Sequence, residues 1–356
     1  MSRRSRLDHL DMLRGLAAVL VLAGHLRHFM FDEFAALAGP SLLTKLFYLV
    51  TSLQHQAVII FFALSGFLVG GKAFDDLAKG SFSWQRYMLR RITRLWIVMI
   101  PALVLTLVFD AFAGGHAVAE AQTGAGVFLG NLLFLQNIFV PVLGSNAPLW
   151  SLANEFWYYV LGPVLIALAI GRGSMMKRGI ALATLLIVGS TFPGSVLAGG
   201  VIWLSGAFAA WASRIRKEEA WLRAPLVRLT ALVALCSALG GSKFLFLDAA
   251  ATPLGTVTDS DVVLGAIVAL TLPVLALLPP PTVAYTHMAR ATSEISYTLY
   301  VTHYPFLIVL LTTGLHYTKS APTIGGLILY IGLLERFPFR LARSLRLRNS
   351  LRIRVG

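Results

Sequence analysis

The amino-acid sequence predicts an all-α polytopic membrane protein with about ten transmembrane helices and with both termini in the cytoplasm. Of its 356 residues, 57% are hydrophobic and only 13% are charged, and the mean hydropathy is +0.76. Soluble domains carry about 25% charged residues, so this composition excludes a soluble α/β enzyme and a disordered chain. The apolar runs are long and unbroken, which argues against a transmembrane β-barrel with its ~10-residue alternating segments.

Each expected span is an apolar segment close to the ~20 residues that a helix needs to cross a bilayer. The first run contains Asp11 and Arg14 and is followed by no cleavage-type sequence, so it is expected to be a retained span rather than a signal peptide. In chain order the expected spans are 11–31, 50–70, 95–112, 149–170, 179–193, 195–212, 225–247, 262–279, 294–314 and 322–335.

The segment 126–140 is the doubtful one, because it is short and contains Asn131, Gln136 and Asn137. If it is re-entrant or interfacial and the N-terminus is inside, the segments between the spans place nearly all Lys and Arg residues on the cytoplasmic side. If it crosses the membrane, the basic clusters at 172–178 and 214–217 move outside. The positive-inside rule therefore favours ten spans without this segment.

The net charge of +14 does not indicate a nucleic-acid partner, because the basic residues lie in short clusters between apolar spans. The chain is expected to form one membrane domain, 1–336, in contact with membrane lipids, followed by a basic cytoplasmic amphipathic tail, 337–356, on the anionic inner leaflet. The single cysteine, Cys236, lies in an apolar run, so no intramolecular disulfide is expected.

Polar residues inside the first span form one stripe. Arg14 and His25 are eleven residues apart, which is about 20° past three full helical turns, and Asp11 lies within about 40° of the same line. Ionisable residues within a membrane span indicate function by default. Arg14 alone is also explained by snorkelling to the headgroups. A buried neutral His25 is suited to act as a general base near neutral pH.

Two further spans carry ionisable residues that are expected at a similar depth. Glu155 lies about two turns into the fourth span, where its natural partner is His25 in a base-and-orienter pair. Ser296, Tyr300 and His303 follow one another at helical spacing on one face of the ninth span. A packing or helix-start role for Glu155, and a structural role for His25 and for His303, remain alternatives.

A cytoplasmic cluster holds four arginines, Arg86, Arg90, Arg91 and Arg94. Arg94 is about one helical turn from Arg90 and from Arg91, so their guanidinium groups converge in a way that suits a ligand with several phosphates. Cytoplasmic retention by charge is the alternative explanation. The histidines show no metal-ligand spacing, so no metal is expected, and Ser65 and Gly66 are interpreted as small residues for close helix packing.

Five segments carry recognisable patterns in one order along the chain. They are LDMLRGLAAVLVLAGH (R-G-φ-A-x-x-x-V-x-x-x-H, φ apolar), FFALSGFLVGG (F-F-x-L-S-G-F-L), RRITRLW (R-x-x-R), LWSLANEFWYY (W-S-L-x-x-E-x-x-Y) and SYTLYVTHYP (S-Y-x-x-Y-x-x-H-x-P). Together they resemble the membrane-bound acyltransferase-3 family of bacterial O-acyltransferases over about residues 8 to 336. One departure is ERFPF, where the family often has E-[KR]-P, which leaves the role of Glu335 open.

The resemblance implies an acyltransferase of the bacterial cytoplasmic (inner) membrane. It would transfer an acyl group, most commonly acetyl, from cytoplasmic acyl-CoA to a hydroxyl of a surface or lipid-linked carbohydrate at the outer face. His25 would be the base or acyl acceptor, Glu155 would orient it, and His303 would line the same cavity. The acyl donor, acetyl-CoA or another acyl-CoA, would be bound by Arg14, Arg90, Arg91 and Arg94.

Further roles in substrate binding follow as hypotheses from the residues themselves. Asp11 belongs to the polar stripe, Trp150 is suited to stack on a sugar, and Tyr300 or Asn154 to hold an oxyanion. A transporter that exports a glycan or small solute would also explain buried charges, although the sequence shows no internal repeat of the kind found in transporters. A structural partner of a polysaccharide synthase is a third reading, and the oligomeric state is left open.

Overall fold

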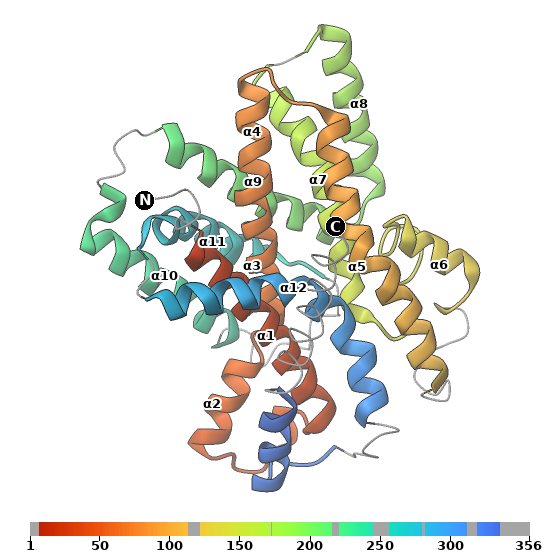
Figure 1. Ribbon diagram of the computed structural model, residues 1–356, viewed down its shortest axis with the longest axis vertical. Helices are drawn as coiled ribbons and strands as arrows, with labels where there is room; N and C mark the ends of the chain where they lie inside the picture. Colours follow the sequence, from red (N-terminus) through yellow and green to blue (C-terminus); the bar gives the residue numbers. More distant parts are fainter. Residues whose placement is uncertain are drawn as a thin grey trace, which may run out of the picture.

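The computed structural model describes residues 7–112, 122–171, 173–215, 221–244, 256–279, 282–311 and 319–334. Glu335 and the predicted tail 337–356 lie outside these residues. The described chain is built of helices (Figure 1). In order they are α1 (Asp8–Met30), α2 (Leu42–Thr51), α3 (Gln54–Ser65), α4 (Gly71–Ala78), α5 (Trp84–Phe112), α6 (Ala125–Leu132), α7 (Trp150–Ala169), α8 (Met175–Thr191), α9 (Gly194–Ile215), α10 (Pro225–Phe244), α11 (Asp259–Leu277) and α12 (Val283–Val309).

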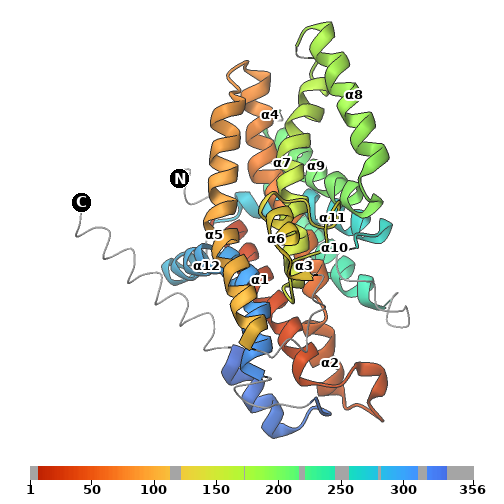
Figure 2. The same ribbon diagram turned by 90° about the vertical axis from the view of Figure 1, so that its right-hand side faces the viewer.

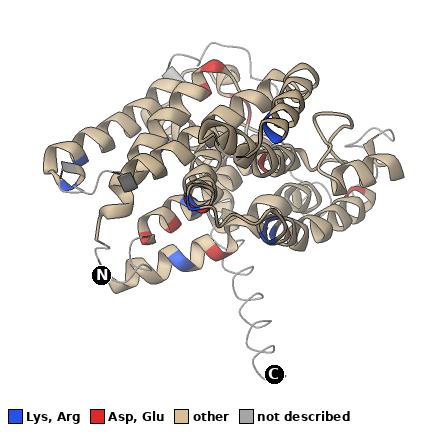
Figure 3. Ribbon diagram, turned by 90° about the horizontal axis from the view of Figure 1, so that it is seen from above, with Lys and Arg blue, Asp and Glu red and all other residues tan. Residues whose placement is uncertain are grey.

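The helices confirm a polytopic membrane protein. Within the residues that the structure describes, seven helical stretches are long and apolar enough to cross a membrane, the longest being Leu42–Ala78. The sequence predicts about ten, and the difference has two causes. Helix α8 has 17 residues and Ile324–Leu334 is shorter still, whereas α12 is long but carries polar residues along its first half. Charged residues form short, separated bands on the ribbon (Figure 3), as expected where most of the helix surface faces lipid.

The segment 126–140 does not span the membrane in this structure. Helix α6 has 8 residues, which is about 12 Å of helix and far less than the ~30 Å of a bilayer core. The chain then turns back at Asn137, which has a φ of 66°. Asn131 holds the segment of this loop that runs back toward α6. Its amide nitrogen donates to the Pro141 carbonyl, and its amide oxygen accepts from the Leu143 backbone N–H.

The loop from α6 to α7 is tied to two long helices. The side-chain amide of Asn146 donates to Thr106 Oγ1 in α5 (3.0 Å) and to the Val301 carbonyl in α12 (2.9 Å). The carboxylate of Asp110, at the end of α5, accepts from both the backbone N–H and the hydroxyl of Ser145. This loop is therefore a fixed part of the helix bundle.

Helices α1 and α12 lie side by side and form the most extensive helix pair of the molecule (Figure 2). Polar contacts join them at several levels. Near the start of both helices, Asp8 is buried and pairs with Arg290 at 3.3 Å. One turn further along α1, Asp11 accepts from the Ser293 hydroxyl at 3.0 Å. The apolar face of α3 packs on α1 and supplies much of the main core.

A π-helical turn, Gly66–Gly70, joins α3 to α4 and packs closely against α9. The Trp203 carbonyl lies where a Cβ on Gly66 would be, so only glycine fits at this position. The sequence-based interpretation of Gly66 as a close-packing residue is therefore confirmed. Ser65, the residue before this turn, is buried and accepts a hydrogen bond from the indole N–H of Trp203. Its hydroxyl points inward, into the bundle.

Replacing Gly66 by alanine is expected to destabilise the protein, because the new methyl group meets backbone atoms of α9 that cannot move independently. The expected cost is about 1–3 kcal/mol, as for other overpacked sites. Thermal unfolding of the purified protein in detergent measures it. Gly179→Ala in α8 is the matched control, since nothing lies near the added methyl group there. Equal melting temperatures for the two variants would contradict the close packing.

Candidate active site

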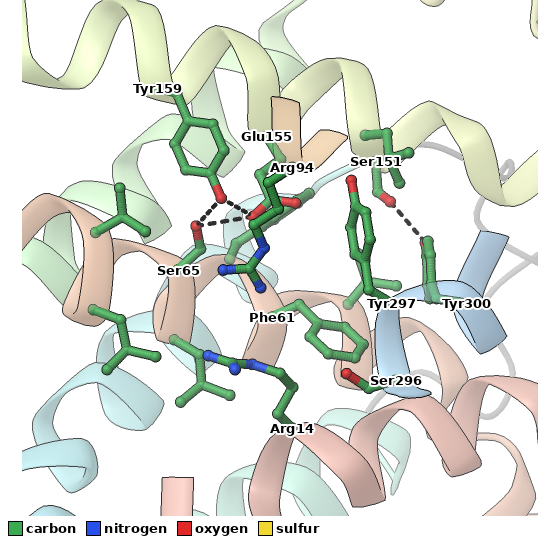
Figure 4. A pocket seen from close by; sticks show the side chains of 16 residues that line it. Arg14, Phe61, Ser65, Arg94, Ser151, Glu155, Tyr159, Ser296, Tyr297 and Tyr300 are labelled. Atoms are coloured by element: carbon green, nitrogen blue, oxygen red, sulfur yellow. Dashed lines mark hydrogen bonds between the residues drawn. The ribbon is translucent and has the colours of Figure 1, made fainter. Parts of the chain in front are cut away.

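An internal cavity of about 80 Å³ lies between α1, α3, α5, α7 and α12 (Figure 4). Most of its wall is apolar and comes from α3, whereas its charged groups, Arg14, Arg94 and Glu155, come from three other helices. The polar lining consists of Arg14, Ser65, Arg94, Ser151, Glu155, Tyr159, Ser296, Tyr297 and Tyr300. Four of the predicted site residues, Arg14, Arg94, Glu155 and Tyr300, are therefore brought together around one cavity.

Two arginines from different helices face this cavity. Arg14 lies 3.6 Å from the Asp11 carboxylate and donates to the Ser293 hydroxyl at 3.3 Å. The guanidinium of Arg94 lies 6.0 Å from the centre of the Tyr297 ring, a distance typical of a cation–π contact. Asp11 thus serves to hold Arg14 from the side, and its carboxylate does not line the cavity.

Arg94 also connects the cavity to two open grooves. One groove, of about 860 Å³, runs between α5 and α12 and is lined by Arg14, Arg90 and Arg290 among others. The other, of about 390 Å³, lies between α4 and α5 and is the more basic. Its cationic residues are Lys72, Arg86, Arg90, Arg91 and Arg94. The arginines predicted to converge on a phosphate ligand therefore border grooves that lead to the cavity.

Glu155 is held by a hydrogen-bond network on the far side of the cavity from Arg14. Its Oε1 accepts from the Ser65 hydroxyl at 3.0 Å and from the Tyr159 hydroxyl. The indole N–H of Trp203 donates to the Ser65 oxygen at 3.2 Å. Ser65 was interpreted from the sequence as a packing residue only, and its place in the F-F-x-L-S-G-F-L segment is the signal that indicates a role in the site.

His25 and His303 form the second polar centre. His25 Nδ1 and His303 Nε2 are 2.8 Å apart, and the two rings are stacked with their centres 5.0 Å apart. Both side chains are at least nine-tenths buried. His303 Nδ1 lies 3.0 Å from the Leu299 carbonyl, one turn back in α12. The structure thus joins the first and ninth predicted spans through these two histidines.

The Leu299 contact fixes the hydrogen positions of this pair when both rings are neutral. A carbonyl oxygen only accepts, so His303 Nδ1 carries the proton and His303 Nε2 is an acceptor. His25 Nδ1 must then donate to it, which leaves the lone pair of His25 Nε2 available. Among the described residues, no hydrogen-bond partner lies at His25 Nε2. This is the arrangement of an oriented base.

The predicted pair of His25 and Glu155 is wrong in this structure, because His303 takes the place beside His25. The sequence fixes the depth of a residue in the membrane but not the neighbour that its helix face meets. Helix α12 packs along α1, whereas α7 packs mainly against α5 and α9. Glu155 therefore faces the cavity and Ser65 rather than the histidines.

Three other predicted substrate-binding residues take different places. Ser151 donates to the Tyr300 hydroxyl at 2.7 Å, so Tyr300 closes part of the cavity wall. Trp150 is only 5% exposed and packs edge to face on Phe62, which leaves no free ring face for a sugar. Asn154 is fully buried, and its side-chain amide has no hydrogen-bond partner among the described residues.

Comparison with known proteins identifies the family. The family model described as an acyltransferase domain, acyltransferase 3, matches residues 7–334. The chain is 29% identical over 227 residues to a Streptomyces mycarofaciens protein named acyltransferase MdmB. The aligned region covers 60% of this chain and 55% of the relative. It is 30% identical over 129 residues to an uncharacterized Haemophilus influenzae protein, covering 33% of this chain and 51% of the relative.

The matches to these curated relatives span about half of the relatives' own length. No solved structure matches this chain. The family match, in contrast, extends over nearly all of the described helices and includes every residue of the cavity and of the histidine pair. On this evidence the chain belongs to the acyltransferase 3 family.

Proposed function

We propose that this protein transfers an acyl group, most simply acetyl, from acyl-CoA to a carbohydrate hydroxyl across the cytoplasmic membrane of a bacterium. One observation supports the proposal above all others. Helices α1 and α12 both line the cavity that holds Arg14 and Arg94, and they also carry the histidine pair, in which His25 Nε2 has no hydrogen-bond partner among the described residues. The acyltransferase name of the Streptomyces relative agrees with this chemistry.

The distance between the two centres suits a donor and an acceptor on opposite sides of the membrane. Arg14 and His25 are eleven residues apart on α1, which is about 16 Å along the helix axis. The phosphates of acyl-CoA would lie in the arginine-lined grooves on the cytoplasmic side, with Arg94 at their junction. The acceptor carbohydrate, exopolysaccharide, O-antigen or a lipid-linked glycan, would approach His25 from the outer side.

In the proposed reaction, His25 Nε2 removes the proton of the acceptor hydroxyl as its oxygen attacks the thioester carbonyl. The carbon–sulfur bond breaks, and the CoA thiolate leaves with its electron pair. His303 accepts the hydrogen bond of His25 Nδ1 throughout and stabilises the positive charge that forms on His25. In the alternative covalent route, His25 Nε2 attacks the carbonyl and carries the acyl group before the hydroxyl takes it.

Tyr300 is the proposed hydrogen-bond donor to the oxyanion of the reacting carbonyl. Its hydroxyl lies 2.7 Å from Ser151 Oγ, which also has the Pro148 carbonyl as an acceptor at 3.2 Å, and its ring lies 6.2 Å from that of His303. Glu155 would accept from an amide N–H of the donor's pantetheine arm, since one of its oxygens is already occupied by Ser65 and Tyr159.

Replacing each histidine in turn is expected to distinguish the role of His25 as the base from the role of His303 as its orienting partner. His25→Ala removes the base, and the expected loss in kcat for acetyl-CoA turnover is about 10²–10⁴-fold. His303→Ala leaves the base but frees its ring, so a smaller loss is expected. His303→Gln still offers an oxygen that accepts from His25 Nδ1, and it should recover part of the activity. Release of free CoA thiol by the purified protein measures all three.

Thermal melts show whether these variants remain folded. A loss in His303→Gln as large as that in His25→Ala would contradict an orienting role for His303. Full activity in a folded His25→Ala variant would overturn the assignment of the base.

Arg94→Ala is expected to weaken acyl-CoA binding more than any change at an arginine outside the grooves. A hydrogen bond between charged groups contributes about 1.5–3 kcal/mol, so the expected rise in Kd is about 10- to 100-fold. Calorimetric titration of the purified protein with CoA measures it, and the difference should shrink as salt is added. Arg178→Ala, which removes the same charge from α8, is the control and should bind CoA as the unmodified protein does.

The proposed orientation is testable because the chain has a single cysteine, Cys236. In a Cys236→Ala background, one new cysteine is introduced at a time, either by Ser81→Cys or by Ala38→Cys. Ser81 lies in the exposed turn between α4 and α5, and Ala38 lies in the exposed loop before α2. A membrane-impermeant maleimide should label position 38 in intact spheroplasts and position 81 only in inverted vesicles. The reverse pattern would place the arginine-lined grooves outside the cell and contradict the proposed donor side.

A further inference from the structure

We propose that Phe61 sets the size of the acyl group that this protein accepts, with Tyr300 as the opposite wall of the passage. This inference rests on the proposed function, because it assumes that the acyl end of the donor enters the cavity. It concerns a residue of α3 that lies outside both the arginine cluster and the histidine pair.

The cavity has a donor end and a closed end, and its position along α3 distinguishes them. Its α3 side extends from Val58 through the π-helical turn to Val69. Leu68 and Val69 also line the basic groove between α4 and α5, so this is the end at which a donor would enter. Val58 therefore marks the opposite end, about 16 Å away along the helix axis.

Phe61 and Tyr300 meet near the closed end. Their ring centres are 5.7 Å apart in an edge-to-face contact, and the Ser151 hydroxyl ties Tyr300 to α7 at 2.7 Å. Figure 4 shows Phe61 among the lining residues, with Arg14 on one side of it and Tyr297 and Tyr300 on the other. Neither His25 nor His303 lines the cavity, although His303 lies one helical turn beyond Tyr300. The two rings therefore stand between the cavity and the base.

The acyl group is the leading end of an acyl-CoA that enters from the arginine side. To reach His25, it must fit at the Phe61–Tyr300 contact, in a space of about 80 Å³ whose wall there is aromatic. Each methylene group that a hydrophobic pocket does not accommodate costs about 10- to 200-fold in kcat/KM. A small acyl group such as acetyl passes at the lowest cost, and butyryl should be strongly disfavoured.

Phe61 is the better of the two residues to vary. Tyr300 has a hydrogen bond to Ser151 and a proposed part in the chemistry, whereas Phe61 contributes an apolar ring only. Phe61 is also only half-buried, in contrast to its neighbour Phe62, which packs in the core against Trp150 and Tyr158. Phe61 packs against both hydrophobic clusters of the core. A leucine variant, which keeps part of this packing, is therefore compared with the alanine variant.

The test is the turnover of acetyl-, propionyl- and butyryl-CoA by the unmodified protein, Phe61→Ala and Phe61→Leu, with cell-envelope carbohydrate supplied as the acyl acceptor and the release of CoA thiol as the measurement. We expect the ratio of kcat/KM for butyryl-CoA to that for acetyl-CoA to rise at least about tenfold in Phe61→Ala, with a smaller rise in Phe61→Leu. Phe67→Ala is the matched control. It removes the same ring from the same helical run, but Phe67 does not line the cavity, so the ratio should not change.

The outcomes separate the size filter from the function on which it rests. If acetyl-CoA is turned over but the ratio is the same in all variants, the size filter is wrong and the acyltransferase proposal stands. If Phe67→Ala shifts the ratio as much as Phe61→Ala, a general loosening of the bundle explains the change and the filter is again wrong. If the unmodified protein turns over no acyl-CoA, the proposed function itself fails. Phe61→Leu keeps the test decisive if the alanine variant does not fold.

Discussion

Polar groups inside a membrane must find their partners within the protein, because lipid offers none, and the contact between α1 and α12 is where this protein meets that requirement. Asp8 and Arg290 pair near the start of the two helices, and His25 and His303 pair near their ends. Each of these contacts satisfies a group that would be costly alone in an apolar environment. The histidines keep a fixed orientation because the whole length of both helices is aligned in this way.

The cavity follows from the same alignment. With α1 and α12 fixed, α3 closes one side with apolar residues, while α5 and α7 bring Arg94 and Glu155 to the other sides. The glycine turn after Ser65 lets α9 approach closely enough for Trp203 to hold the Ser65 hydroxyl. Two arginines, an apolar wall and the histidine pair beyond it are thus positioned by five helices.

Helical periodicity was enough to predict the polar stripe of the first span and the convergence of the arginines, because both depend on spacing within one helix. The partner of Glu155 depends on which helix faces α7, and neither depth nor hydropathy contains that information. Helix α12 is long, but its polar residues lower its hydropathy, so it is not among the long apolar helices of the described chain. Trp150 was expected at a sugar because an aromatic ring looks the same in sequence whether it is buried or exposed.

The hydrogen bond from Asn146 to Val301 has a cause four residues further along α12. Residue 305 is a proline, which has no backbone N–H, so the Val301 carbonyl has no helical donor at its usual position. The side-chain amide of Asn146 donates to this carbonyl instead. The carbonyl that the proline leaves without a helical donor thus attaches a loop from another part of the chain to α12. Because Val301 lies only two residues before His303, the proline ties the loop before α7 to the part of α12 that carries the histidine pair.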